Sequence, residues 1–338
     1  MTSARISLPI SDRDDIIAGF AAATQRLALV RAAVARQIFG QEIVVEQCLS
    51  VLLAGGHGLI VGVPGLGKTK LVELLAATLG LGTRRVQCTP DLMPADILGS
   101  EVLDQEPDGT RRFRFIEGPV FTQLLMADEI NRASPRTQSA LLQAMAEQRV
   151  AVAGINRALP APFHVLATQN PLEHEGTYPL PEAQLDRFLL EIRIDYPRLE
   201  AERAMLLATT GLQAVPTETV LDAQGLIGLQ HLVRAMPVSE QVVAAILRLV
   251  RGARPQTPIL PDLSTVLDWG PGPRAAQALM LTGRARALLH GREAPELEDV
   301  AALAAPILRH RLGLSFAAKA EGVDIEDLIA RLVAAALE

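Results

Sequence analysis

Cysteines, aromatic side chains and long apolar runs are all scarce in this chain of 338 residues. Its two cysteines, Cys48 and Cys88, lie far apart and outside any C-x-x-C spacing, which disfavours a disulfide framework and a cysteine-bound metal. The longest apolar runs are far shorter than the ~20 residues that a membrane-spanning helix needs. The opening stretch MTSARISLPISDRDD has no apolar segment of the signal-peptide type. We therefore expect a cytoplasmic protein with no membrane span.

A basic excess is also missing. The formal net charge is −6, which argues against nucleic acid as a general partner, although a local basic groove is compatible with it. Hydrophobic residues make up 49% of the chain and charged residues 21%, as in globular proteins with a large core. The length allows two or three domains. Because aromatics are only 3%, we expect helices that pack through small and branched aliphatic side chains.

Short apolar runs alternate with helical segments in the first part of the chain. The first helical segment is expected over 13–55 and another over 68–80. Four nearly continuous apolar runs have the pattern of strands covered on both faces, namely residues 58–62, 84–89, 123–128 and 163–170. The run 190–195 alternates instead, which is typical of an edge strand. Strands separated by helices indicate a parallel α/β sheet flanked by helices.

Two β-prone insertions interrupt this alternation. The stretch near 102–116 contains a Pro-Asp-Gly turn, and the stretch near 148–160 contains Ala-Gly between alternating arms, so both are predicted hairpins. After Pro197 the pattern is helical with no further strand. We therefore predict an α/β core with a helical N-terminal segment over 1–197, and an all-helical domain over 198–338.

The stretch GVPGLGKT matches the phosphate-loop pattern G-x-x-x-x-G-K-[ST], with a predicted strand before it and a helix after it. Its residues are Gly62, Val63, Pro64, Gly65, Leu66, Gly67, Lys68 and Thr69. The glycines let backbone N–H groups face a pyrophosphate, which the helix N-terminus also favours. Lys68 would reach the β- and γ-phosphates, and the Thr69 hydroxyl would bind Mg²⁺. A chance glycine loop is the alternative, but the flanking elements favour a nucleotide site.

Two adjacent carboxylates lie at the end of the predicted strand LLMAD, the first as its last residue and the second directly after it. Asp128 would lie at the carboxyl end of that strand, where a Mg²⁺ next to Thr69 would be bound. Glu129 could polarise the attacking water. The alternative is a pair of solvated carboxylates at a strand end. Because they follow a phosphate loop, we favour the catalytic interpretation.

Asn170 and Arg274 are further candidates. Asn170 ends the fourth apolar run, at the edge of the sheet where open α/β sheets bind ligands, and its amide could hold the attacking water. An Asn before Pro171 can also simply stabilise a turn. Arg274 lies in GPGPRA, where a helix is predicted to begin after Pro273.

Arg187 lies in the proline-framed stretch TYPLPEAQLDRF. An arginine stays charged, and its planar guanidinium fits phosphate oxygens, so Arg187 could serve a phosphate that its own chain does not hold. An ion pair within the chain, with Asp186 or Glu182, is the alternative.

Taken in order, these motifs resemble the AAA+ ATPases and, among them, the MoxR family of the helix-2-insert clade. The resemblance rests on GVPGLGKTKL, LLMADEINRASPRTQSALLQAMAEQ, ATQNPLEHEGTYPLPEAQLDRF and GPGPRA, and it extends from IFGQE to ILRHRLGL. It implies an AAA+ core with a smaller C-terminal helical lid, and ATP with Mg²⁺ bound between them.

The resemblance also implies a role for each matching residue. Asp128 and Glu129 match the Walker B pair, and Asn170 matches sensor 1. Arg187 matches the arginine finger, which such rings donate to the ATP of the neighbouring subunit. Arg274 matches sensor 2, and whether it acts on its own subunit's ATP or a neighbour's stays open.

The resemblance extends to binding segments and partners. The segment from Ile38 to Gln41 matches the part that lies along the adenine. The hairpins match the helix-2 insert and the pre-sensor-1 hairpin, which usually face the pore of the ring. The family implies a homo-oligomer, usually hexameric, that remodels or activates a client protein together with a von Willebrand factor A domain partner.

Two other functions stay open at this stage. The first is a nucleic-acid motor of the same clade, supported only by the basic residues Arg111, Arg112 and Arg114 on the first hairpin. The second is a non-catalytic scaffold switched by ATP, against which Glu129 and Arg187 argue.

Overall fold

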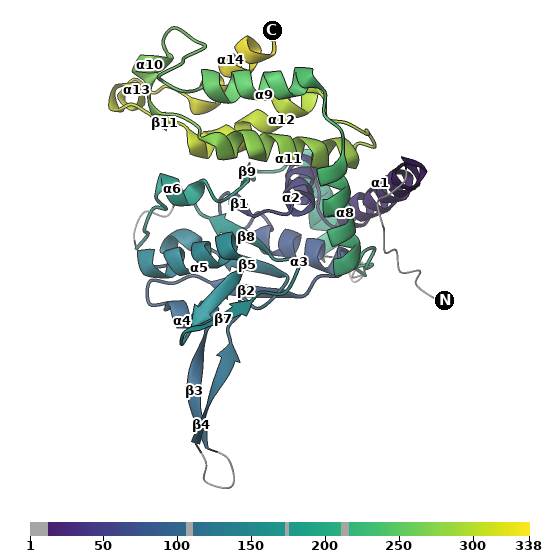
Figure 1. The fold of residues 1–338 in the computed structure, drawn as a ribbon, viewed down its shortest axis with the longest axis vertical. Coiled ribbons are helices and arrows are strands. Elements are labelled where there is room, and N and C mark those ends of the chain that lie inside the picture. Colours follow the sequence, from purple (N-terminus) through teal and green to yellow (C-terminus); the bar gives the residue numbers. More distant parts are fainter. Residues whose placement is uncertain (1–12, 106–110, 173–175, 211–215) are drawn as a thin grey trace.

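The computed structural model describes residues 13–105, 111–172, 176–210 and 216–338. Five parallel strands form the main sheet in the order β2-β5-β8-β1-β9 (Figure 1). Their bounds are β1 Gly58–Val61, β2 Thr83–Gln87, β5 Leu124–Asp128, β8 His164–Gln169 and β9 Leu190–Arg193. The predicted parallel α/β sheet is confirmed, and so is the edge position of β9.

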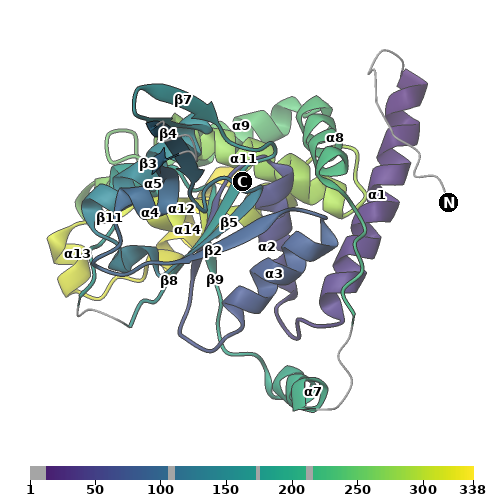
Figure 2. The ribbon, with the colours of Figure 1, turned by 90° about the horizontal axis from the view of Figure 1, so that it is seen from below.

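Helices cover both faces of this sheet (Figure 2). They are α1 Arg13–Ala35, α2 Glu42–Leu53, α3 Lys68–Thr78, α4 Pro94–Leu98, η1 Ile130–Arg132, α5 Pro135–Glu147 and α6 Glu182–Leu185. Neighbouring residues of a strand point to opposite faces. Along β1, Ile60 packs in the core that contains α1–α3, whereas Leu59 packs in the core that contains α5. Strand β1 is therefore buried on both faces, as its apolar sequence predicts.

Strand β2 departs from the prediction. It forms the second edge of the sheet, and Val86 is its only buried residue. The expectation that this run is covered on both faces is therefore wrong. An edge strand has one unpaired side, which tolerates polar side chains. Arg85 and Gln87 are consequently available to the end of β5 next to them.

Both predicted hairpins are present. Their strands are β3 Gly99–Gln105 with β4 Arg111–Glu117, and β6 Arg149–Val152 with β7 Ile155–Ala158. The Pro-Asp-Gly turn of the first hairpin lies outside the described residues. This hairpin projects from the body on the side away from the lid (Figure 1). At its base, the guanidinium of Arg157 on β7 lies 4.0 Å from the ring centroid of Phe115, so the two hairpins are in contact.

The chain after β9 is mainly helical. Its elements are α7 Leu199–Thr210, α8 Ala223–Ala235, α9 Glu240–Gly252, α10 Leu263–Val266, β10 Leu267–Trp269, α11 Pro273–Leu289, α12 Leu297–Leu308, η2 Arg309–Arg311, β11 Gly313–Leu314, α13 Phe316–Ala320 and α14 Ile325–Leu337. The short strands β10 and β11 pair antiparallel, so the all-helical expectation is wrong in this detail. Strands of two or three residues are too short to show an alternating pattern.

The helical lid packs directly on the core. Helix α11 contacts α2, and α12 contacts β9, so the lid covers the β9 edge of the sheet. The apolar core continues through this contact without a break. The domain boundary after Pro197 therefore stays a prediction. Within the described ranges, no helix combines the length and the apolar character needed to cross a membrane.

Candidate functional site

The phosphate loop connects the carboxyl end of β1 to α3. Gly65 and Gly67 have φ angles of 85° and 75°, in the left-handed region that other residues rarely adopt. A Cβ at either position would meet no atom within 4 Å, so the loop is open on that side. Gly62 is required for a different reason, because a Cβ there would lie 2.7 Å from the carbonyl oxygen of Ile194. Only glycine lets the loop leave β1 so close to the end of β9.

Lys68 and Thr69 form the first turn of α3, and both are half-buried. The Lys68 ammonium donates to the carbonyl oxygen of Gly62 at 2.5 Å, so the side chain folds back across the loop. The loop thus combines a cation with the positive end of a helix, which together favour an anion such as a phosphate.

Asp128 ends β5 and is buried. One carboxylate oxygen accepts a hydrogen bond from the Thr168 hydroxyl at 2.5 Å, and the other accepts one from the Arg85 guanidinium at 2.5 Å. Thr168 belongs to β8 and Arg85 to β2, the two strands that flank β5. The carboxylate is therefore oriented by both neighbours, and its remaining lone pairs can still bind a metal.

Glu129 has a φ angle of 53°, a left-handed conformation that costs a non-glycine residue of order 1 kcal/mol. Its backbone N–H donates to the Thr168 hydroxyl at 2.9 Å. Its carboxylate accepts from the Gln87 amide at 2.8 Å and from Arg132 at 3.0 Å. Thr168 thus orients both acids, and side chains from β2 and η1 fix the Glu129 carboxylate.

Asn170 follows β8 and is only 3% exposed. Its side-chain oxygen accepts the backbone N–H of Leu172 at 3.1 Å, which is the turn-stabilising contact considered as an alternative. Strand β8 lies between β5 and β1, so Asn170 follows the strand that separates the two acids from the phosphate loop. Its predicted role toward a phosphate stays a prediction.

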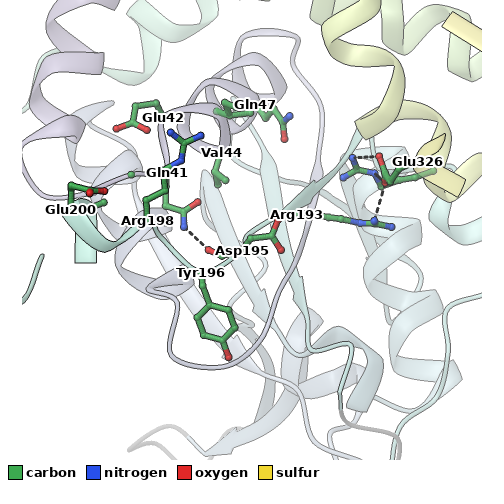
Figure 3. A pocket seen from close by; sticks show the side chains of 14 residues that line it. Gln41, Glu42, Val44, Gln47, Arg193, Asp195, Tyr196, Arg198, Glu200 and Glu326 are labelled. Carbon is green, nitrogen blue, oxygen red and sulfur yellow. Dashed lines mark hydrogen bonds and ion pairs between the residues drawn. The ribbon is translucent and has the colours of Figure 1, made fainter. Parts of the chain in front are cut away.

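A hollow of about 800 Å³ opens between the core and the lid (Figure 3). Among its lining residues are Gln41 and Tyr196 from the core, Glu200 from α7, and Arg309 and Glu326 from the lid. A second hollow of about 310 Å³ reaches the phosphate loop, where its lining residues include Gly62, Val63 and Leu66. The two hollows share Arg193, Asp195 and Tyr196. They therefore form one path from the loop to the start of α2, and Pro64 is exposed beside it.

Ion pairs join the lid to β9 inside the larger hollow. Glu326 of α14 pairs with Arg193 at 2.9 Å and with Arg309 at 3.0 Å (Figure 3). Arg309 also donates to the carbonyl oxygen of Glu191 at 3.1 Å. Burial raises the pKa of the Glu191 carboxyl above its ordinary value, although Arg193 and Arg309 oppose the shift. A ligand in this hollow would contact both parts of the chain.

The two named residues of the segment predicted to lie along the adenine line different hollows. Gln41 lines the larger hollow, and its amide donates to the carbonyl oxygen of Asp195 at 2.8 Å (Figure 3). Ile38 packs against the core and lines a separate hollow beside α1. The structure therefore brings Gln41, but not Ile38, to the cavity next to the phosphate loop.

Arg187 lies at the opposite end of the sheet from the phosphate loop. Strands β1 and β9 pair in parallel, with Gly58 opposite Leu190 and Val61 opposite Arg193. Arg187 precedes the first of these pairs, whereas the loop follows the second. A strand rises about 3.3 Å per residue, so roughly 10 Å of strand separates the two regions even before the connecting residues are counted.

The contacts of Arg187 differ from those of a local ion pair. Its guanidinium donates to the carbonyl oxygen of Leu142 on α5, and among the described residues it pairs with neither acidic neighbour. Asp186 instead binds Arg311 of the lid at 2.7 Å and lies 3.5 Å from Arg274. Arg274 is in the first turn of α11, and its side chain is 57% exposed. Arg311 and Arg274 thus share the carboxylate of Asp186, the residue next to Arg187 in the chain.

Several residues of these sites escaped the sequence interpretation. Arg85, Gln87 and Thr168 hold the two acids, and their only signal was a polar side chain within or next to an apolar run. Arg193 and Arg311 connect the lid to the core, and the sequence contained no indication of their partners.

Comparisons with known proteins were made with this geometry in hand. The model of the ATPase family associated with various cellular activities (AAA) matches residues 57–190, and that of the AAA lid domain matches residues 263–332. Chaperone MoxR1 of Mycobacterium tuberculosis is 39% identical, covering 93% of this chain and 83% of the relative. Protein MoxR of Paracoccus denitrificans is 34% identical, covering 82% and 86%.

A solved structure is similar over the same extent. The crystal structure of a candidate ATPase from Cytophaga hutchinsonii has a TM-score of 0.88 and 33% identity, covering 95% of this chain and 97% of that one. The likeness therefore extends over both the core and the lid.

Proposed function

This chain belongs to the MoxR family of AAA ATPases, and we propose that it hydrolyses ATP in a ring whose active sites are each shared by two subunits. The observation that carries the proposal is the position of Arg187 at the opposite end of the sheet from the phosphate loop. One chain supplies the loop and the two acids, and its neighbour supplies the arginine.

ATP and Mg²⁺ fit the residues of the loop and the β5 acids. The open side of Gly65 and Gly67 leaves room for phosphates. The Thr69 hydroxyl and the Asp128 carboxylate are oxygen ligands of the kind that Mg²⁺ prefers. When bound, Mg²⁺ neutralises charge on the β- and γ-phosphates. In this proposal, the hollow between core and lid takes the ribose and base, with Gln41 on its wall.

The remaining steps of hydrolysis are assigned to side chains of the protein. Lys68 compensates phosphate charge, and Glu129 accepts a proton from the attacking water while Asn170 orients that water. Arg187 of the neighbouring subunit stabilises the charge that develops as the γ-phosphate departs, an effect that can be worth ~10³–10⁵ in rate. Since arginine is always charged and planar, it suits this position better than lysine.

Arg274 is proposed to act from the same side as Arg187. It lies 3.5 Å from Asp186, the residue next to Arg187 in the chain. It is not among the described residues that line either hollow beside the phosphate loop. We therefore assign Arg274 to the nucleotide of the neighbouring subunit.

The biological role is proposed to be that of a chaperone-like remodeller. Support comes from the relative named Chaperone MoxR1 and from the matching core and lid. The proposal includes a hexameric ring in the cytoplasm, hairpins that face its pore, a von Willebrand factor A domain partner and a client protein. A nucleic-acid motor is less well supported, because Arg114 on the first hairpin is already paired with Asp104 at 3.0 Å.

The test measures ATP turnover and molecular mass together over a range of protein concentrations. Specific activity should rise steeply over the concentrations at which light scattering detects multi-subunit particles. Lys68→Ala is the matched control, which should neither bind ATP nor turn it over. A specific activity that stays flat while the protein remains monomeric would overturn the shared site. A salt-sensitive affinity for DNA would instead favour the nucleic-acid motor.

A further inference from the structure

A buried arginine joins the lid to the turn that carries Arg187. Arg311 is the last residue of η2 and is 2% exposed. Its guanidinium donates to the Asp186 carboxylate at 2.7 Å. It also donates to the backbone carbonyl oxygens of Asp186 at 3.3 Å, Phe188 at 2.6 Å and Leu189 at 3.1 Å. These contacts hold the backbone on both sides of Arg187.

Stability alone is a poor explanation for this arrangement. Burying a charged pair costs desolvation that often equals or exceeds the gain, and apolar residues of similar volume can serve as well. An arginine has five N–H donors in a fixed fork, so it can specify the positions of several oxygens at once. In Arg311 this fork binds one lid carbonyl, that of Ile307 at 2.7 Å, together with the oxygens of the Arg187 turn. The geometry fixes the turn relative to the lid.

The same lid segment also reaches the chain's own nucleotide hollow. Arg309, at the start of η2, lines that hollow and binds Glu326 and the Glu191 carbonyl. Arg311, at the end of η2, holds the turn of Arg187. One three-residue segment, Arg309–Arg311, therefore contacts both the chain's own site and the arginine assigned to the neighbouring one.

We propose that Arg311 is a positioning residue, which orients Arg187 toward the nucleotide of the neighbouring subunit. This inference rests on the proposed shared site, because it requires Arg187 to act across the interface.

The first test is the substitution Arg311→Lys, which keeps the charge but loses the fork. A displacement of about 1 Å in a catalytic group can cost ~10²-fold, so we expect turnover to fall roughly 10–100-fold with ATP affinity unchanged. Arg286→Lys is the matched control. Arg286 is also a lid arginine that joins the core, through Glu46 of α2 at 2.9 Å, but it does not contact the Arg187 turn. This control should keep wild-type turnover.

Mixing experiments identify which side of the interface Arg311 serves. Mixed with Glu129→Gln, Arg311→Lys should recover activity, because an intact Glu129 then meets a well-positioned Arg187 from the other chain. Mixed with Arg187→Ala, Arg311→Lys should recover no activity, because both substitutions impair the side of the interface that donates Arg187. The reverse pattern would place Arg311 in its own nucleotide site and overturn the proposal. Wild-type activity of Arg311→Lys alone would also overturn it.

A readout without nucleotide separates this inference from the shared site. The backbone N–H groups of Phe188 and Leu189 are hydrogen-bonded to the carbonyl oxygens of Leu185 and His57. Hydrogen exchange at these two groups should accelerate in Arg311→Lys but not in Arg286→Lys. Unchanged exchange would contradict the positioning role. If Glu129→Gln and Arg187→Ala fail to complement each other, the shared site is wrong, and exchange alone decides whether Arg311 holds the turn.

Two controls guard against a folding defect. Asp186→Asn removes the ion pair but keeps the carbonyl contacts of Arg311, so we expect a smaller loss with the same mixing pattern. The single tryptophan, Trp269, packs against Gly313 beside η2, where a Cβ would lie 1.8 Å from its Nε1 atom. Its fluorescence should match wild type in each variant. Loss of activity without the predicted mixing pattern in Asp186→Asn would count against the proposal.

Discussion

The two ends of the main sheet differ in how their functional side chains are held. At the carboxyl end, the phosphate loop and the β5 acids follow directly from their strands, and the loop is open. At the amino end, the turn of Arg187 is held by Arg311, which binds Asp186 from 125 positions later in the chain. The carboxyl end is open to a ligand, whereas at the amino end the half-buried Arg187 donates to the carbonyl oxygen of Leu142 and, in our proposal, serves the neighbouring subunit.

This difference predicts that substitutions at the two ends affect different steps. Arg187→Ala should lower turnover by ~10³–10⁵ while ATP still binds, because the arginine contributes mainly in the transition state. Lys68→Ala at the loop should abolish ATP binding itself. Nucleotide affinity by calorimetry and steady-state turnover check both expectations. Weakened ATP affinity in Arg187→Ala at concentrations where the protein is monomeric would contradict the division.

A second prediction concerns the carboxyl end alone. Glu129→Gln should lower turnover by ~10²–10⁴, the usual contribution of a general base, and should leave ATP bound. The amide can still accept from Gln87 and Arg132, so the local structure should persist. Single-turnover measurements separate hydrolysis from product release. Turnover close to wild type would remove Glu129 from the mechanism.

A third prediction concerns a substitution that destabilises the lid and changes no residue at either end of the sheet. The fully buried Asp299 pairs with Arg286 at 2.6 Å and Arg292 at 2.6 Å. Removing one partner of a buried ion pair costs about 3 kcal/mol, so Asp299→Ala should lower the free energy of unfolding by that amount. Glu298→Gln is the control, because this partner of Arg286 is 71% exposed and should contribute less than about 1 kcal/mol. Urea denaturation measures both, and equal losses would contradict the burial.

The last prediction concerns pH at the amino end of the sheet. The His57 ring, just before β1, has its pKa lowered to about 3, chiefly by burial and also by nearby His164. Below about pH 6.5, His57 is therefore protonated in the unfolded chain but stays neutral in the folded chain. The free energy of unfolding should then fall as pH drops from about 6.5 toward 3, by up to ~1.4 kcal/mol per pH unit for this group. Urea denaturation at several pH values measures the slope.

Two variants test the origin of that slope. His57→Gln should make it shallower but not remove it, because burial also lowers the pKa of His164 and His310. His231→Gln should leave it unchanged, because His231 is exposed. A slope as steep in His57→Gln as in wild type would assign the effect to other groups.

The sequence predicted the carboxyl end better than the amino end. The phosphate loop is a contiguous pattern, and Asp128, Glu129 and Asn170 each follow an apolar run, so strand ends located them. Strand β2 was misjudged because Val86 and Cys88 lie in a run that looked buried, although an edge strand tolerates polar neighbours. The β10–β11 pair was missed because it is too short to show any period.

The amino end was only partly predictable. Arg187 was located by its proline-framed stretch and by resemblance, but nothing in the sequence identified Arg311 as the residue that holds its turn. That contact joins segments far apart in the chain, and it is decided by how α12 packs against β9. Long-range polar contacts of this kind depend on tertiary geometry, which local patterns do not encode.

The most direct test of the shared site mixes two inactive variants, Glu129→Gln and Arg187→Ala, and measures ATP turnover against the mixing ratio. The proposal predicts partial recovery that is greatest near equal amounts, because some interfaces then pair an intact Glu129 with an intact Arg187. Mixtures that stay as inactive as either variant, at concentrations where wild type is fully active, would contradict it.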